Sequence, residues 1–299
     1  MKHLKNLSYT LHIQLQQILN LFLLLVLAKY TAFLSYGWDK IIIVLILTLA
    51  MAYLLHYIQQ RTILPYIPYS ALTTALGVLL MSFATHLWIT IVVIFIALVQ
   101  KHFLRIENRH IFNPSNFALI FGLFFFYSDF HIVLGQLGDS LYLATLVLFL
   151  GSIILYRIER WIISIAFAIF YLLCQYFIII QTDPVMEMEN ILLRFYSVSF
   201  ILFVLFMLTD PKTTPAQPLR QIFFAGTLAL VATILDYTNG FRVQHLFMAL
   251  FIISASLPLF SHIRSSDKKR YLVWCIFVLA MGAIILIELR PPYYFAMDV

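Results

Sequence analysis

The sequence predicts an all-α integral membrane protein, a polytopic transmembrane helix bundle, and three observations lead to this conclusion. Hydrophobic residues make up 63% of the 299 residues and charged residues only 11%, whereas soluble domains are close to half apolar and a quarter charged. Apolar runs of about 20 residues, long enough to cross a hydrocarbon core of about 30 Å as helices, recur along the chain. Most charges fall between these runs.

The apolar windows between polar breaks predict eleven spans. They cover roughly residues 11–35, 40–58, 70–86, 88–104, 116–135, 140–157, 161–181, 192–209, 221–237, 244–262 and 271–289. The third is short and begins close to Pro65 and Pro68, which favours a partial or re-entrant segment. If residues 11–35 lie along the interface instead, ten spans remain. No soluble domain separates the spans, so residues 1–299 are expected to form one membrane domain.

The lysines and arginines predict the orientation. When the spans alternate in direction, fourteen of the 19 lysines and arginines fall on one side and five on the other. Cytoplasmic loops retain such charges, so we expect a bacterial inner-membrane protein with its N-terminus inside and its C-terminus outside. The outer set includes Arg194 and Arg242. Arg242 could pair with Asp236 across an exposed outer loop.

The excess of lysine and arginine over acidic residues is therefore interpreted as a topology signal. We expect the lipid bilayer as a partner and no nucleic acid. The two cysteines lie inside apolar runs, without the spacing of a zinc or iron–sulfur site. Motifs of serine hydrolases, zinc proteases and phosphate-binding loops are missing from the sequence. We predict neither a catalytic residue nor a metal ligand.

Two connections between apolar helices differ from ordinary loops. We call residues 101–117, which contain Asn113-Pro114-Ser115-Asn116, the first junction, and residues 208–215, Leu-Thr-Asp-Pro-Lys-Thr-Thr-Pro, the second junction. A proline after Asn or Asp breaks a helix, and Asn116, Thr213 or Thr214 could cap the next one. A helix start that faces a cavity favours phosphate or an electron-rich ring edge. The alternative is a plain capped turn at the cytoplasmic surface.

Both junctions carry a resemblance to a known family. The stretch from Tyr69 to Phe125, with Asn113-Pro-Ser-Asn near its end, resembles the RnfD/NqrB family of membrane electron-transport subunits. The second junction is similar to the family's Thr-Asp-Pro-Val-Thr stretch, and the helices up to Leu257-Pro258-Leu259 follow the family's order. The resemblance covers about residues 40–262, flanked by an N-terminal helix in residues 1–39 and a C-terminal helix in residues 263–299.

The resemblance implies a redox subunit that binds flavin, as FMN or riboflavin, and passes electrons with other subunits, to which cation translocation could be coupled. The family's Ser-x-Ala-Thr motif for covalent FMN is missing here, so non-covalent binding is expected. The expected cofactor-binding residues are Asn113, Pro114, Asn116, Thr209, Asp210, Pro211, Thr213 and Thr214, with Lys101 and Lys212 as counter-charges. Two alternatives are a cofactor-free channel or secondary transporter with this fold, and a scaffold subunit.

Overall fold

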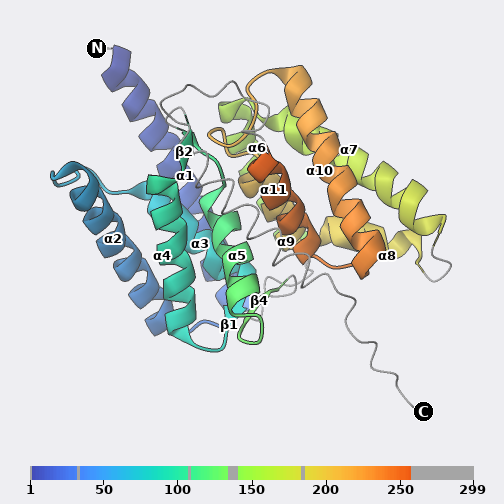
Figure 1. Cartoon of the computed structure of the whole chain (residues 1–299), viewed down its shortest axis with the longest axis horizontal. Helices are drawn as coiled ribbons and strands as arrows, with labels where there is room; N and C mark the ends of the chain where they lie inside the picture. Colours follow the sequence, from blue (N-terminus) through green and yellow to red (C-terminus); the bar gives the residue numbers. More distant parts are fainter. Residues whose placement is uncertain (1, 32–33, 107–108, 134–140, 183–185, 257–299) are drawn as a thin grey trace.

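The computed structural model describes residues 2–31, 34–106, 109–133, 141–182 and 186–256 (Figure 1). It is an all-α membrane bundle. The helices are α1 Lys2–Thr31, α2 Trp38–Gln60, α3 Tyr69–Met81, α4 Leu87–Phe103, α5 Pro114–Phe125, α6 Leu141–Ile158, α7 Trp161–Cys174, α8 Met188–Tyr196, α9 Val198–Leu202, α10 Pro218–Asn239 and α11 Gln244–Ser256. Two π-helical segments, η2 Gln175–Ile180 and η3 Phe203–Met207, continue α7 and α9.

Five helices in the described part of the chain are long and apolar enough to cross a membrane, or six if one bent pair counts as a span. The bent pair is α8 with α9–η3, and its halves meet at 63°. The bend is located at Ser197, whose extended backbone interrupts the helix while its side chain accepts a hydrogen bond from the Phe200 N–H at 3.2 Å. The predicted crossing by residues 192–209 is therefore broken near its start.

Each predicted stretch before residue 257 contains a helix, but several of these helices are too short to cross a membrane by themselves. Helices α3, α5 and α11 have 13, 12 and 13 residues, which gives a length of about 20 Å against a core of about 30 Å. They are partial spans inside the bundle. The predicted C-terminal span, residues 271–289, lies outside the described residues.

Short extended segments follow two of these partial spans. Strand β1, Ser82–Ala84, follows α3, and strand β4, Phe130–Ile132, follows α5. They pair antiparallel, with Phe83 opposite His131. The pairing satisfies backbone groups that lipid cannot satisfy. A second short pair, β2 Arg105–Ile106 with β3 Arg109–His110, lies in the first junction.

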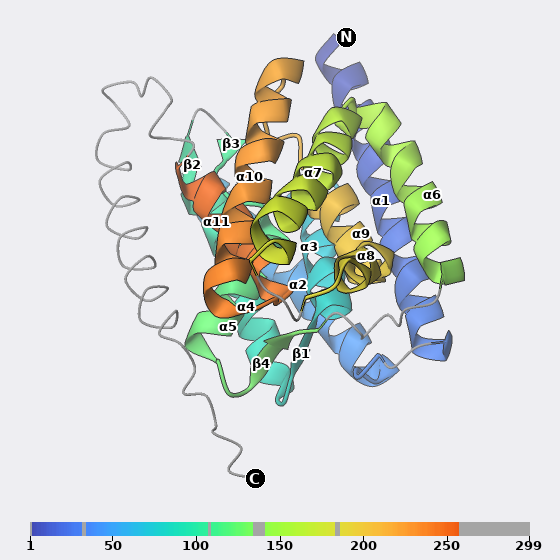
Figure 2. The same ribbon diagram turned by 90° about the vertical axis from the view of Figure 1, so that its right-hand side faces the viewer.

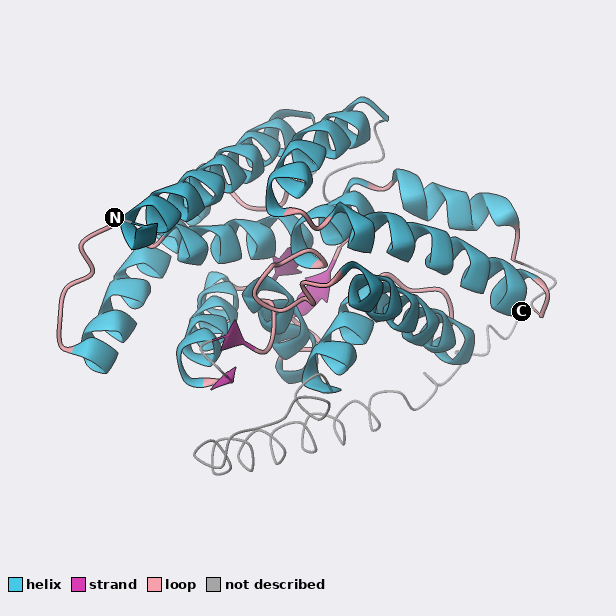
Figure 3. Ribbon diagram, turned by 90° about the horizontal axis from the view of Figure 1, so that it is seen from above, coloured by secondary structure: helices cyan, strands magenta, loops and turns pink. Residues whose placement is uncertain are grey.

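The two halves of the chain contribute to one core. Helices α7 and α10 lie side by side, and α1 lies beside α6 and packs on α3 (Figures 1 and 2). Asn116 of α5 donates to the carbonyl of Phe247 of α11 at 3.2 Å, and Phe112 stacks on Phe251 at 4.7 Å. Because the numbering rises along one segment as it falls along the other, α5 and α11 run antiparallel. The view from above shows the short strands lying among the helices (Figure 3).

Candidate functional site

The first junction is built around the start of α5. The side-chain oxygen of Asn113 accepts hydrogen bonds from the N–H groups of Ser115 at 3.0 Å and Asn116 at 3.2 Å. Asn113 is therefore the N-cap, and Pro114 occupies the first helical position, where no N–H is needed. The prediction that Asn116 caps this helix is wrong, because Asn116 lies one turn inside it.

The second junction folds around one aspartate. The backbone carbonyl of Asp210 accepts from the hydroxyls of Thr213 at 3.3 Å and Thr214 at 2.7 Å, and its carboxylate accepts from the Lys212 N–H at 3.0 Å. The expectation that these threonines cap the next helix is also wrong, because α10 begins at Pro218 after Gln217. The threonines instead close a compact turn.

The two junctions contact each other across the bundle. Nε2 of His110 lies 3.2 Å from Oδ2 of Asp210, and Nδ2 of Asn113 donates to the carbonyl of Met207 at 3.3 Å. Burial alone would raise the pKa of Asp210. The hydrogen bond and charge of His110, together with the N–H and charge of Lys212, outweigh burial and hold that pKa below its ordinary value.

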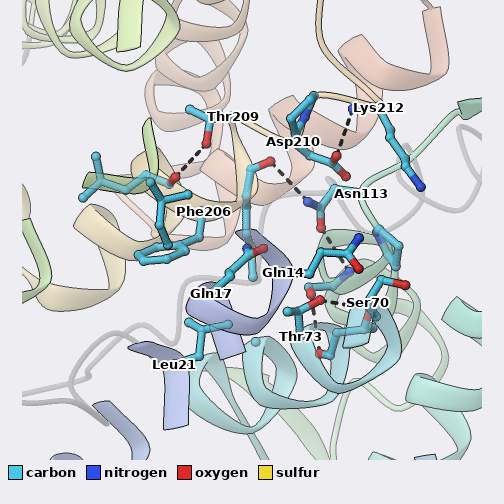
Figure 4. Close-up of a pocket in the computed structure, with 18 of the residues that line it drawn as sticks. Gln14, Gln17, Leu21, Ser70, Thr73, Asn113, Phe206, Thr209, Asp210 and Lys212 are labelled. Carbon is cyan, nitrogen blue, oxygen red and sulfur yellow. Dashed lines mark hydrogen bonds between the residues drawn. The ribbon is translucent and has the colours of Figure 1, made fainter. Parts of the chain in front are cut away.

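A cavity of about 350 Å³ lies where the junctions meet (Figure 4), and this volume is at the lower end of the range for small-molecule sites. Seven of the ten predicted residues line it: Lys101, Asn113, Pro114, Thr209, Asp210, Pro211 and Lys212. Asn116, Thr213 and Thr214 do not line the cavity. Their side chains hydrogen-bond to backbone carbonyls that lie outside the cavity wall or within the second junction.

The cavity is polar at one end and apolar at the other. One face of α3 runs along it, from Ser70 through Gly77 to Met81, a distance of about 16 Å along the helix. Lys101, only 8% exposed, donates to the hydroxyl of Ser70 at the polar end. The apolar lining includes Leu21, Leu80, Leu202 and Phe206. In Figure 4, Leu21 and Lys212 lie at opposite ends of the group of labelled residues.

The lining carries more basic than acidic side chains. Three of the described lining residues, Lys101, Arg157 and Lys212, are basic, and Asp210 is the single carboxylate among them. A cavity with this charge and an apolar end suits an anion that carries an apolar body.

Several lining residues could not be chosen from sequence. Ser70, Thr73 and Arg157 lie close to the predicted residues only in space, whereas His110 lies three residues before Asn113 in the first junction. The sequence does contain a signal for Gln14 and Gln17, because two amides three residues apart in a helix lie on one face. The predicted junction residues alone did not reveal which helix would close the cavity, and that helix is α1.

Comparison with known proteins finds a similarity to a family in the second half of the chain. Residues 127–269 match the NQR2, RnfD, RnfE family. The predicted resemblance is therefore confirmed over this part of the chain, which holds the second junction and the helices α6 to α11. The first junction precedes the matched segment of the NQR2, RnfD, RnfE family. No curated protein matches the chain.

A second buried polar cluster lies away from the cavity. The carboxylate of Asp236 accepts from Arg194 at 2.8 Å, from Gln175 at 2.7 Å and from Tyr171 at 2.9 Å. Its other oxygen lies 2.8 Å from Nδ1 of His245. We call these five residues the Asp236 cluster. Partners surround both carboxylate oxygens, so the cluster is a cross-link between α7–η2, α8, α10 and α11.

The Asp236 cluster overturns one expectation. Asp236 does not form an exposed pair with Arg242, of which only the backbone N–H contacts the carboxylate, at 3.2 Å. Its ionic partner is Arg194, which was expected among the charges at the outer side but is buried, with its guanidinium 3.3 Å from the ring centre of Phe241. Burial favours this pairing because an isolated charge inside a bundle is costly.

Proposed function

We propose that the cavity binds a flavin, FMN or riboflavin, without a covalent bond, and that the chain is an electron-transport subunit of a membrane complex. The observation that supports this is the meeting of both junctions at one cavity with a cationic end and an apolar end. When bound, a flavin would accept and release electrons. The match of residues 127–269 to the NQR2, RnfD, RnfE family supports the same class of protein.

The residues present fit such a group. Lys101 and Lys212 would balance a phosphate or the added electrons, and Asn113 would hold the start of α5 towards them. Phe206 and the leucines would contact the apolar ring and exclude water. Thr209, whose hydroxyl donates to the Leu205 carbonyl at 2.6 Å, would fix the wall beside the ring.

The cationic end of the cavity is proposed to face the cytoplasm. Lys101, Arg157 and Lys212 line this end, and lysine and arginine are retained on the cytoplasmic side of bacterial membranes. Other subunits would supply and remove the electrons, because a flavin held in one membrane subunit needs a donor and an acceptor.

The test is a flavin titration of the purified full chain in mild detergent. The chain is expected to show flavin absorbance, or to bind added flavin, and to release it on denaturation. Lys101→Met should weaken FMN binding about tenfold, the effect of about 1.4 kcal/mol, and weaken riboflavin binding less. Lys40→Met, at an exposed position outside the cavity, should change neither. A colourless chain that binds no added flavin would overturn the proposal.

A second candidate function, a secondary transporter, is favoured by the partial spans. Antiparallel short helices such as α5 and α11 are typical of transporters in which broken helices surround a central site. The same cationic cavity would then carry an organic anion. A colourless chain that moves an anion into liposomes would select this function over electron transport.

A further inference from the structure

The wall of the cavity that α1 supplies carries amides that the proposed function does not yet use. Gln14 and Gln17 line the cavity and stand three residues apart, on one face of the helix. Figure 4 shows both extending into the space bordered by Asn113, Ser70 and Phe206. Both are partly buried.

Among the described residues, neither amide has a hydrogen-bond partner. Gln16, on the same turn, accepts a hydrogen bond from Arg157 instead. A primary amide offers one acceptor and two donor hydrogens, and burying it without a partner is costly. The amides of Gln14 and Gln17 therefore face the cavity with hydrogen-bonding capacity that a ligand could satisfy.

The spacing of the two amides defines the chemistry that they could recognise. Their Cα atoms are separated by about 4.5 Å along the helix axis, so two amides can address neighbouring groups on one edge of a planar ring. An edge with carbonyl oxygens on both sides of an N–H complements them, because each amide can both donate and accept. Such an imide edge is found in the ring system of flavins, and quinones lack its N–H.

We infer that Gln14 and Gln17 are specificity-determining residues that read the imide edge of the bound ring, while Lys101 and Lys212 take the anionic group. This inference rests on the proposed function and adds the part of the ligand that α1 recognises. Helix α1 precedes residues 127–269, the segment that matches the family.

The experiment combines a change in the protein with a change in the ligand. Wild-type chain and Gln14→Met/Gln17→Met in detergent are each titrated with riboflavin and with N3-methylriboflavin, whose imide N–H is blocked. Methionine keeps the length of the side chain without the amide. Gln59→Met, at an exposed position on α2, is the matched control.

The wild type and the control should bind riboflavin about tenfold more tightly than the methylated form, since a hydrogen bond to a well-placed partner contributes on the order of 1 kcal/mol. The double variant should lose this preference and bind riboflavin about 10- to 100-fold more weakly. Its melting temperature without ligand should stay within a few degrees of wild type.

Two results would overturn the inference while leaving the proposed function standing: flavin binding with no preference in the wild type, or an unchanged preference in the double variant. The second result includes equal weakening of the binding of both ligands in the double variant, because that pattern indicates a changed cavity shape rather than edge recognition. If the wild type binds no flavin, the proposed function fails and the inference fails with it.

Discussion

His110 and Asp210 hold the two junctions together, with Nε2 of one 3.2 Å from Oδ2 of the other although 100 residues separate them in the chain. The nearby hydrogen bond from Asn113 to the Met207 carbonyl adds a second link. The cavity therefore has a wall made of two interdependent turns. A substitution in one turn should alter the structure of the other.

The acid stability of the chain should depend on Asp210. Its pKa in the folded chain lies below the ordinary value of 3.8. A lowered pKa contributes stability that is complete above the unfolded-state pKa and is lost as the pH falls through the folded-state pKa. We expect the melting temperature to drop below about pH 4, and Asp210→Asn to show a shallower drop. Melting curves from pH 7 to pH 3 measure this, and identical pH profiles would contradict it.

Asn113 should stabilise the chain in two ways, as the N-cap of α5 and as the donor to Met207. Asn113→Ala removes both roles and should cost about 1–2 kcal/mol. Asn113→Asp keeps an acceptor for the cap and loses the donor, so its stability should lie between alanine and wild type. Thermal melts in detergent rank the three, and an alanine variant as stable as wild type would refute the assignment.

Gly77 allows α3 and α5 to approach closely. A Cβ at this position would lie 2.8 Å from Oγ and 3.2 Å from Cβ of Ser115. Gly77→Ala should therefore destabilise the chain by about 1–3 kcal/mol through overpacking. The same change in a Ser115→Ala background should cost less, because the closest atom is gone. Equal costs in both backgrounds, measured by melting, would show that Ser115 is not the obstacle.

Arg194 should be among the residues whose loss is most damaging. Arg194→Met leaves the buried Asp236 carboxylate without its cation, which should cost about 3–5 kcal/mol. Adding Asp236→Asn should recover part of that cost, because the uncompensated charge disappears. Arg242→Met, which leaves the backbone contact intact, should change stability by less than about 0.5 kcal/mol. The sequence-predicted Asp236–Arg242 pair predicts the opposite ranking.

Hydropathy predicted where helices would form but not where they would end. The window 116–135 was expected to be one span, yet α5 ends at Phe125 and the chain continues into strand β4. Helix and extended strand inside a bundle are equally apolar, so composition does not separate them. The turn between them is fixed by the pairing with β1, a contact between distant segments.

The cavity residues were predictable where a local signal existed. Asn-Pro and Asp-Pro marked both junctions, and seven of the ten residues expected there line the cavity. The predicted caps were wrong because the helices begin at Pro114 and Pro218, which places Asn113 and Gln217 at the N-cap positions. The buried position of Arg194 depends on contacts with α7 and α10, which no local pattern contains.

The pairing of β1 with β4 has a mechanical consequence. Helices α3 and α5 are joined at their far ends by this ladder and held close along their length by Gly77 and Ser115, so they should move as one rigid block. Helix α1 covers the cavity through side-chain packing and shares no strand with that block. Helix α1 would then tilt to accommodate ligands of different thickness, while α3 and α5 keep their positions.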